Sequence, residues 1–296
     1  MSTFVDSITK IESDSSELSI KEEIRTSVPR IPSESNYRLA LKDIFQGIKA
    51  WRIWMFLAWQ DVCIRYRRSY LGTFWITVNM TFTVTVIGFL YGRLLGEDLK
   101  FYYPQLAAGL LLWNLTSACI TDSVSAFLKS QDYIRQIRLP YFVYVLRVIA
   151  KNFFIFLYHF LVFIPVMVMF QVEFTFATLL VFPCLLLILC LGLIYAVLLG
   201  LVGARFPDLR YMINNLVHAI FFVTPVLWPT GRLPERFQYL MKFNPFAQVI
   251  ELVRNPMLGK MPSLFAVGEV MGFLLLGMVV MFWAFAQKRK QIIYWL

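Results

Sequence analysis

Arginine side chains that could bind phosphate gather in the stretch from Trp59 to Trp75, which reads WQDVCIRYRRSYLGTFW. Arg65, Arg67 and Arg68 stand close together there, and a guanidinium group suits phosphate oxygens because its donors form a fixed fork. The same arginines could instead hold the orientation of the chain through anionic lipid headgroups. Both interpretations place them at the headgroup level of a membrane.

The element that must position these arginines is an amphipathic helix. One helical face carries apolar and aromatic side chains at i, i+3, i+4 and i+7: Trp59, Val62, Cys63 and Tyr66. The opposite face carries Asp61, Arg65 and Arg68. A helix of this kind lies in the membrane interface, with its rings among the lipid and its cations among the phosphates. Gly72 then leads into an uncharged run of about 20 residues, the length that crosses a bilayer.

Residues with the spacing of an enzyme active site are missing from the sequence. It contains no GxxxxGK[ST] loop and no paired carboxylates in a plausible pocket, and its two histidines, His159 and His218, stand alone in apolar runs. The four cysteines lack metal-ligand spacing and indicate small packing residues. We therefore expect no catalytic residue, no metal site and no cofactor on this chain.

The composition indicates a polytopic membrane protein. Hydrophobic residues make up 59% of the 296 residues and charged residues only 16%, far from the average for soluble proteins. The net charge of +10 comes from basic residues between apolar runs, which favours lipid headgroups and topology over nucleic acid. We expect no cleavable signal peptide, because residues 1–36 are polar and lack an apolar core.

The predicted fold class is all-α, with six transmembrane helices behind an N-terminal amphipathic interface helix. Residues 1–36 are expected to form a flexible polar tail, residues 37–71 the interface helix (in one or two pieces), residues 72–290 the transmembrane domain and residues 291–296 a C-terminal tail. The six spans are placed at 72–92, 104–127, 146–170, 175–204, 212–228 and 264–286. With both termini cytoplasmic, the inner segments hold 21 lysines and arginines and the outer segments 7, so this orientation is predicted.

Two segments between the spans have a pattern of their own. The outer segment 229–262 carries five prolines around short apolar pieces, Phe237–Phe243 and Phe246–Leu252, and indicates re-entrant helices or, alternatively, a folded external loop. The inner loop 128–145 predicts a short helix from Gln131 to Ile137 that ends before Pro140. A cytoplasmic helix between two spans is a natural docking point for a partner protein.

The chain resembles the membrane (permease) subunit of bacterial ABC-type polysaccharide exporters, the O-antigen and lipopolysaccharide group. The resemblance covers about residues 40–290. It rests on RYRRSYLGTFW at 65–75, YIRQIRLP at 133–140, GLVGARFPDLR at 200–210, FFVTPVLWP at 221–229 and NPFAQVIELVRNPMLG at 244–259.

The resemblance implies a homodimer in the inner membrane that binds two copies of a cytoplasmic ATPase, with ATP and Mg on that partner. The segment Trp51–Arg68 would be a gate helix beside a lipid-linked glycan, and Pro234–Arg254 would cap the channel from outside. Gln131–Arg138 would be the coupling helix seated in the ATPase, with candidate contact residues Gln131, Asp132, Tyr133, Arg135 and Arg138. Arg65, Arg67 and Arg68 would meet the pyrophosphate of the lipid carrier.

Aromatic side chains could line the path of the glycan, since sugars stack on rings and hydrogen-bond at their edges. The candidates are Tyr91, Tyr102, Trp113, Asn114, Tyr195 and Trp228. Each could equally be a belt aromatic at the membrane surface.

Alternative functions remain open on the sequence alone. Permeases for capsular polysaccharide or teichoic acid share the same plan. A membrane-embedded transferase acting on lipid-linked sugars would need an acid/base cluster at one membrane face, and an ion-driven carrier would need midplane charges or inverted repeats; the sequence offers none of these.

Overall fold

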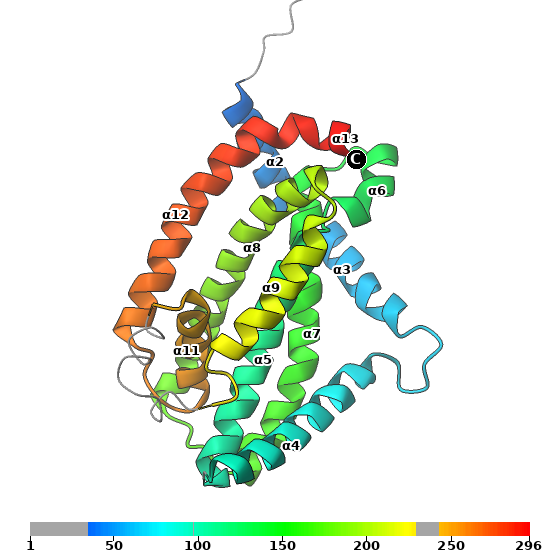
Figure 1. Cartoon of the computed structure of the whole chain (residues 1–296). Helices are drawn as coiled ribbons and strands as arrows, with labels where there is room; N and C mark the ends of the chain where they lie inside the picture. The colour runs from blue at the N-terminus through cyan, green and yellow to red at the C-terminus, as the bar shows by residue number, and fades with distance from the viewer. Residues whose placement is uncertain (1–34, 97, 229–242) are drawn as a thin grey trace, which may run out of the picture.

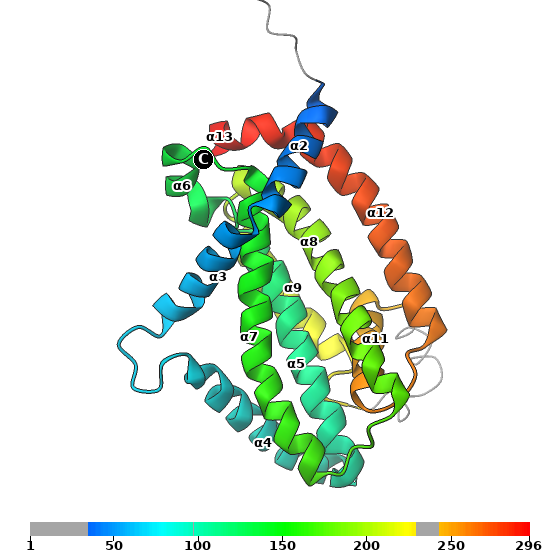
Figure 2. The same ribbon diagram turned by 180° about the vertical axis from the view of Figure 1, so that it is seen from behind.

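The fold was taken from a computed structural model, which describes residues 35–96, 98–228 and 243–296. Every regular element among these residues is helical, as the sequence predicts (Figures 1 and 2). The α-helices are α2 (Asn36–Lys49), α3 (Trp51–Arg65), α4 (Trp75–Leu95), α5 (Leu99–Ser123), α6 (Gln131–Gln136), α7 (Tyr141–Met169), α8 (Val181–Arg205), α9 (Leu209–Val223), α11 (Pro245–Met257), α12 (Leu264–Lys288) and α13 (Ile292–Trp295). Short 3-10 turns are η1 (Gly72–Phe74), η2 (Leu128–Ser130), η3 (Phe176–Leu180) and η5 (Arg289–Gln291).

Four segments of the described chain are long and apolar enough to cross a membrane: Gly72–Leu95, Tyr141–Met169, Phe176–Arg205 and Leu264–Trp295. The other two predicted spans correspond to α5 and α9. Helix α5 is long enough, but polar residues from Asn114 to Asp122 dilute its apolar character. Helix α9 has 15 residues and ends at Val223, short of the predicted 228, because Pro225 lacks a backbone donor and disfavours helix before it.

Helix α5 is the centre of the bundle, which explains its mixed composition. More than half of its residues are buried, and it packs against α4, α7, α8, α9 and α11. A helix enclosed by protein does not need a lipid-compatible surface on every side. Helices α3 and α4 diverge from the bundle on one flank, and α12 runs along the other (Figure 1).

The C-terminal segment is more structured than expected, whereas the N-terminal amphipathic element has the two-helix form that the sequence analysis allowed. Residues 36–65 form two helices, α2 and α3, that meet near Ala50. Residues 291–296, expected as a tail, include helix α13, which packs against α8. Val62, assigned from the sequence to the lipid-facing side of α3, is buried, and Leu57 and Ala58 are buried with it.

The crossing of α5 and α8 depends on small residues. A Cβ added at Gly203 would lie 1.9 Å from the backbone oxygen of Val124, and one at Gly200 would lie 3.0 Å from the ring of Phe127. By contrast, a Cβ at Gly268 or Gly272, the GxxxG pair of α12, would meet nothing within 4 Å. The small residues of α8 therefore let the two backbones approach, as small-residue motifs do in membranes.

We expect Gly203→Ala to destabilise the protein by about 2 kcal/mol, because α5 and α8 must separate to admit the methyl group. The measurement is the apparent melting temperature of the detergent-solubilised protein. Gly272→Ala is the matched control and should leave that temperature unchanged. Equal melting of the two variants would show that the close crossing does not hold the bundle together.

Candidate functional site

The loop between α5 and α7 carries the predicted docking helix. Helix α6 spans Gln131–Gln136 and ends, as predicted, ahead of Pro140. Ile134 is buried and anchors it, whereas the charged side chains predicted to contact a partner, Asp132, Arg135 and Arg138, are exposed. Gln131 and Tyr133 are half-buried. The helix therefore presents a polar, partly cationic surface at one end of the molecule, beside α13 (Figures 1 and 2).

Arg147 of α7 joins this docking helix to the interface helix α3. Its Nε and Nη2 donate to the carboxylate of Asp61 in α3, at 2.7 and 2.6 Å, and its guanidinium lies 5.3 Å from the ring centre of Tyr133 in α6. Such a bidentate, charge-assisted contact is stronger than a hydrogen bond between neutral groups, and it also fixes the relative orientation of the two side chains. Three elements, α3, α6 and α7, thus meet at one arginine side chain.

The C-terminal segment supports α6 from a second side. Arg135 donates from its Nη2 to the backbone oxygen of Leu296. Nearby, the guanidinium of Arg205, the last residue of α8, lies 5.9 Å from the ring of Trp295 and 5.3 Å from that of Phe206. The position of α6 therefore depends on α13 as well as on α7.

Asp43 of α2 forms the most buried polar contact of this region. Its side chain is fully buried and accepts hydrogen bonds from the backbone N–H groups of Tyr141 (3.2 Å) and Phe142 (3.0 Å), at the first turn of α7. Arg289 donates to the same carboxylate from Nε at 2.7 Å. A carboxylate at a helix N-terminus satisfies free donors and interacts favourably with the helix dipole. Asp43 therefore holds α2, the start of α7 and the end of α12 together.

Sequence reasoning missed Asp43, although one signal was present. Ala40, Asp43 and Gly47 are the buried residues of α2 and share one helical face, so this acid lies among small residues instead of on the charged side. A Cβ at Gly47 would lie 2.8 Å from the Cβ of Phe142, which shows how closely α2 approaches α7.

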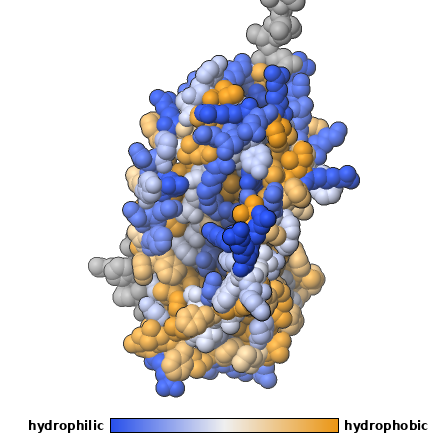
Figure 3. Space-filling model, turned by 90° about the vertical axis from the view of Figure 1, so that its right-hand side faces the viewer, coloured by the Kyte–Doolittle hydropathy of each residue, from blue (hydrophilic) through white to orange (hydrophobic). Residues whose placement is uncertain are grey.

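The three arginines after the interface helix are all exposed. Arg65 ends α3, while Arg67 and Arg68 lie in the turn that leads to α4. Arg68 has a φ of 76°, in the left-handed region. Figure 3 views this flank of the molecule, where hydrophilic side chains gather over the upper part and hydrophobic ones over the lower part. The exposed guanidinium groups of these arginines are thus free to meet phosphate.

The six aromatic and amide candidates do not share one surface of the chain. Tyr102 is buried and donates from its hydroxyl to the carbonyl of Leu227 at 2.6 Å. Trp113 is buried beside Phe221. Asn114 donates to the Leu110 carbonyl at 2.8 Å, and the half-buried Tyr91, Tyr195 and Trp228 pack against the core. Their role along a glycan path stays a prediction.

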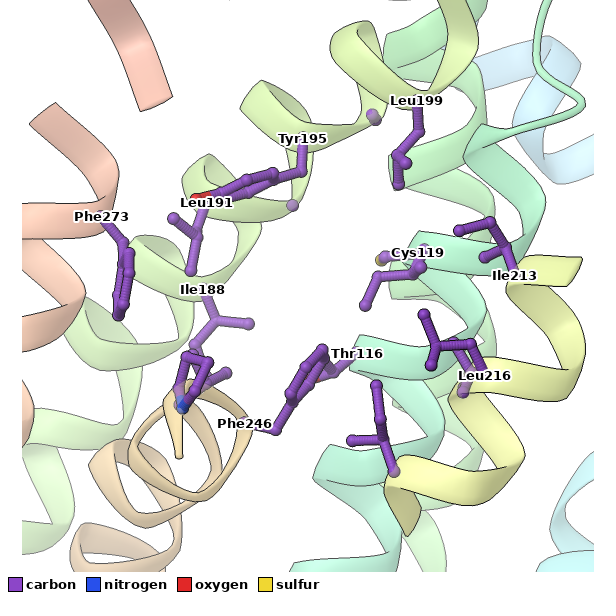
Figure 4. A pocket seen from close by; sticks show the side chains of 17 residues that line it. Thr116, Cys119, Ile188, Leu191, Tyr195, Leu199, Ile213, Leu216, Phe246 and Phe273 are labelled. Atoms are coloured by element: carbon purple, nitrogen blue, oxygen red, sulfur yellow. The ribbon is translucent and has the colours of Figure 1, made fainter. Parts of the chain in front are cut away.

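Tyr195 lines an apolar cavity of about 330 Å³ between α5, α8, α9, α11 and α12. Figure 4 shows Leu191 and Tyr195 of α8 on one side, Cys119 of α5 and Ile213 of α9 on the other, and Phe246 of α11 pointing between them. The lining is almost wholly hydrocarbon, so the cavity suits apolar chains and not sugar hydroxyls.

Away from the end of the bundle that carries α6, the described part of the predicted re-entrant segment 229–262 contains helix α11 (Figure 1). Asn244 caps α11 by accepting from the backbone N–H of Phe246 and Ala247, and Arg254 donates from Nη1 to the carbonyl of Pro225 at 2.9 Å. Burial lowers the pKa of Arg254 from its ordinary value, while the charge of Glu251 opposes that effect. Of the two predicted apolar pieces, Phe246–Leu252 lies in α11, whereas Phe237–Phe243 lies outside the described residues except for Phe243.

Comparison with known proteins gave one family and several relatives. A model of the family described as ABC-2 type transporter matches residues 53–258. The O-antigen export system permease protein RfbA of Klebsiella pneumoniae is 24% identical over 196 residues, covering 64% of this chain and 74% of the relative. The protein of the same name from Myxococcus xanthus is 27% identical over 211 residues, covering 70% and 76%. The family match runs from α3 to the residue after α11, so it contains α6 and the arginines that follow α3.

Proposed function

This chain belongs to the ABC-2 type transporter family, and from that premise we propose that it is the membrane subunit of an ATP-driven exporter that moves lipid-linked O-antigen across the bacterial inner membrane. It is a transport subunit and not an enzyme. In the proposed assembly a separate ABC ATPase subunit binds ATP and Mg and hydrolyses the ATP. The observation that carries the proposal is the family match over most of the chain, together with the export-permease relatives.

The proposed assembly is a homodimer of six-span subunits that binds two ATPase subunits. Helices α5 and α9 are the second and fifth spans. Helix α5 is less apolar than the four candidate spans named above, and its burial among five other helices supports its place as a span. Both termini lie in the cytoplasm in this arrangement, which the excess of lysine and arginine on that side supports. The end of the bundle that carries α6 then faces the ATPase.

Within this assembly, α6 is the coupling helix, and α2 with α3 forms the gate that lies beside the substrate. The contacts of Arg147 with Asp61 and Tyr133 connect these two elements through α7. In this proposal, a displacement of α6 by the ATPase is passed to α3 through the side chain of Arg147. Helix α11 belongs to the re-entrant cap on the outer side, and its buried Arg254 fixes it to the turn after α9.

Co-expression with the ABC ATPase of the same exporter tests this function. We expect the ATPase to co-purify with the chain, and the ATP turnover of the complex in lipid to rise at least about twofold when lipid-linked O-antigen is added. A complex whose ATPase has lost its P-loop lysine is the control for turnover, because that lysine binds the nucleotide phosphates.

Two outcomes would contradict the proposed function. One is an ATPase that does not bind the chain, and the other is a purified chain that alone transfers sugar between lipid-linked substrates. Stimulation by lipid-linked capsular polysaccharide or teichoic acid, but not by O-antigen, would keep the transport function and change the substrate.

A further inference from the structure

A second cavity, of about 320 Å³, lies between α3, α5 and α7 on the side of the bundle that carries α6. Its charged lining consists of four cationic and two acidic side chains: Arg65, Lys129, Arg147, Lys151, Asp61 and Asp122. The wall therefore has an excess of two positive charges. Two of these cations are shielded from solvent, because the side chains of Arg147 and Lys151 are only 12% and 17% exposed.

The two carboxylates of the cavity are already engaged by its cations. Lys129 and Lys151 each bind one oxygen of Asp122, the first at 3.0 Å, while Arg147 binds both oxygens of Asp61. Each ammonium group has three donors and uses one of them on Asp122. The Nη1 of Arg147 is buried and has no hydrogen-bond partner among the described residues. The wall thus holds a buried donor without a partner, and such a donor is costly.

The remaining wall of the cavity is aliphatic. Val62 of α3 and Val148 of α7 are buried there, and Ile155 extends the apolar surface one further turn beyond Lys151. Lys151 lies ten residues into α7, about 15 Å along the helix axis from Tyr141 at the α6 end. A ligand that satisfies both parts of the wall must be anionic at one end and hydrocarbon at the other.

We propose that this cavity binds the phosphate-bearing headgroup of an amphiphile, with Arg65, Lys129 and Lys151 on the phosphate oxygens and Val62, Val148 and Ile155 on the first part of its hydrocarbon chain. The inference rests on the proposed function and deepens it, since it assigns the charged end of a lipid-linked substrate to residues of α3, η2 and α7. Arg67 and Arg68 do not line the cavity, so of the three arginines singled out by the sequence only Arg65 takes part.

Farnesyl diphosphate, an amphiphile with a diphosphate headgroup, is the probe for the test. Its binding is measured by equilibrium dialysis with the complete exporter complex in phosphatidylcholine nanodiscs, after subtraction of binding to empty nanodiscs. Lys129→Gln should weaken binding about tenfold, because a hydrogen bond to a charged group is lost, and Lys129→Gln with Lys151→Gln should weaken it further. Lys129 is 58% exposed on its side chain, so the single variant keeps the fold even where the double variant does not.

Lys49→Gln is the matched control, because Lys49 is an exposed lysine of α2 outside the cavity and its variant should bind as tightly as the unmodified complex. Farnesol and inorganic diphosphate, which each offer half of the ligand, should both bind at least about tenfold more weakly than farnesyl diphosphate.

Equal affinity of the Lys129 and Lys49 variants would overturn the site. Equal affinity for farnesol would overturn the role of phosphate, and equal affinity for inorganic diphosphate would overturn the assignment to an amphiphile. Gel filtration of the same sample separates these failures from failure of the proposed function: an intact, ATP-hydrolysing complex without lysine-dependent binding contradicts the site alone.

Discussion

Asp43→Ala is expected to cause one of the two largest effects of any single substitution in this chain, a loss of about 3 kcal/mol in the free energy of unfolding. The substitution leaves Arg289 without its carboxylate and leaves two backbone N–H groups of α7 without acceptors. All of these groups surround a position that is 1% exposed, so water cannot replace the lost oxygens without opening the junction. Helix α2 and the start of α7 should therefore separate.

The measurement is the apparent melting temperature of the detergent-solubilised protein, which should fall by several degrees. Asp98→Ala is the matched control. Asp98 also accepts from a backbone N–H at a helix N-terminus, that of Lys100 at 3.0 Å, but it is exposed, so its loss should cost only about 1 kcal/mol. Asp43→Asn keeps one acceptor oxygen and should melt between the two. If Asp43→Ala melted like Asp98→Ala, the junction would not depend on the carboxylate.

The contrast between these two aspartates shows what the sequence could and could not reveal. The cap of Asp98 is local, two residues from its partner, and is readable from spacing. The partners of Asp43 lie 98, 99 and 246 residues away, so only the packed bundle shows that this acid is a junction.

The exposure of the aromatic candidates likewise depends on contacts between distant segments of the bundle. Tyr102 and Trp113 were selected for their residue type, but exposure depends on which neighbours a helix acquires, and α5 acquires them on every side. By contrast, the end of α6 before Pro140 was predicted from backbone chemistry, which acts locally. The same rule explains the end of α9 before Pro225, although that span was predicted to continue to residue 228. Helical periodicity and proline therefore predict where helices form and end, whereas the positions of the site residues depend on contacts between distant segments.

The second large effect is expected for the docking helix: Arg138→Glu should reduce co-purification of the ATPase at least about tenfold and abolish ATP-driven export. Arg138 follows α6 directly and is exposed. Reversing its charge replaces attraction by repulsion at an interface with a complementary partner, and charge reversals at such contacts cost several kcal/mol. Arg135→Glu should have a similar effect, but Arg135 also binds the backbone oxygen of Leu296, so its substitution disturbs α13 as well.

Arg138→Glu alone therefore tests docking, and Arg135→Glu with Arg138→Glu tests the whole cationic surface of α6. Lys100→Glu is the control, because Lys100 is an exposed cation in the first turn of α5, at the end of that helix away from α6, and its reversal should leave ATPase binding unchanged. The melting temperatures of Arg138→Glu and Lys100→Glu should agree, which separates lost docking from lost folding.

Should the double variant still bind the ATPase at normal affinity, α6 would not be the coupling helix, and the partner would have to dock on another part of the same end. The exposed surface of α2 is the next candidate there, since α2 lies at that end and is tied to α7 through Asp43.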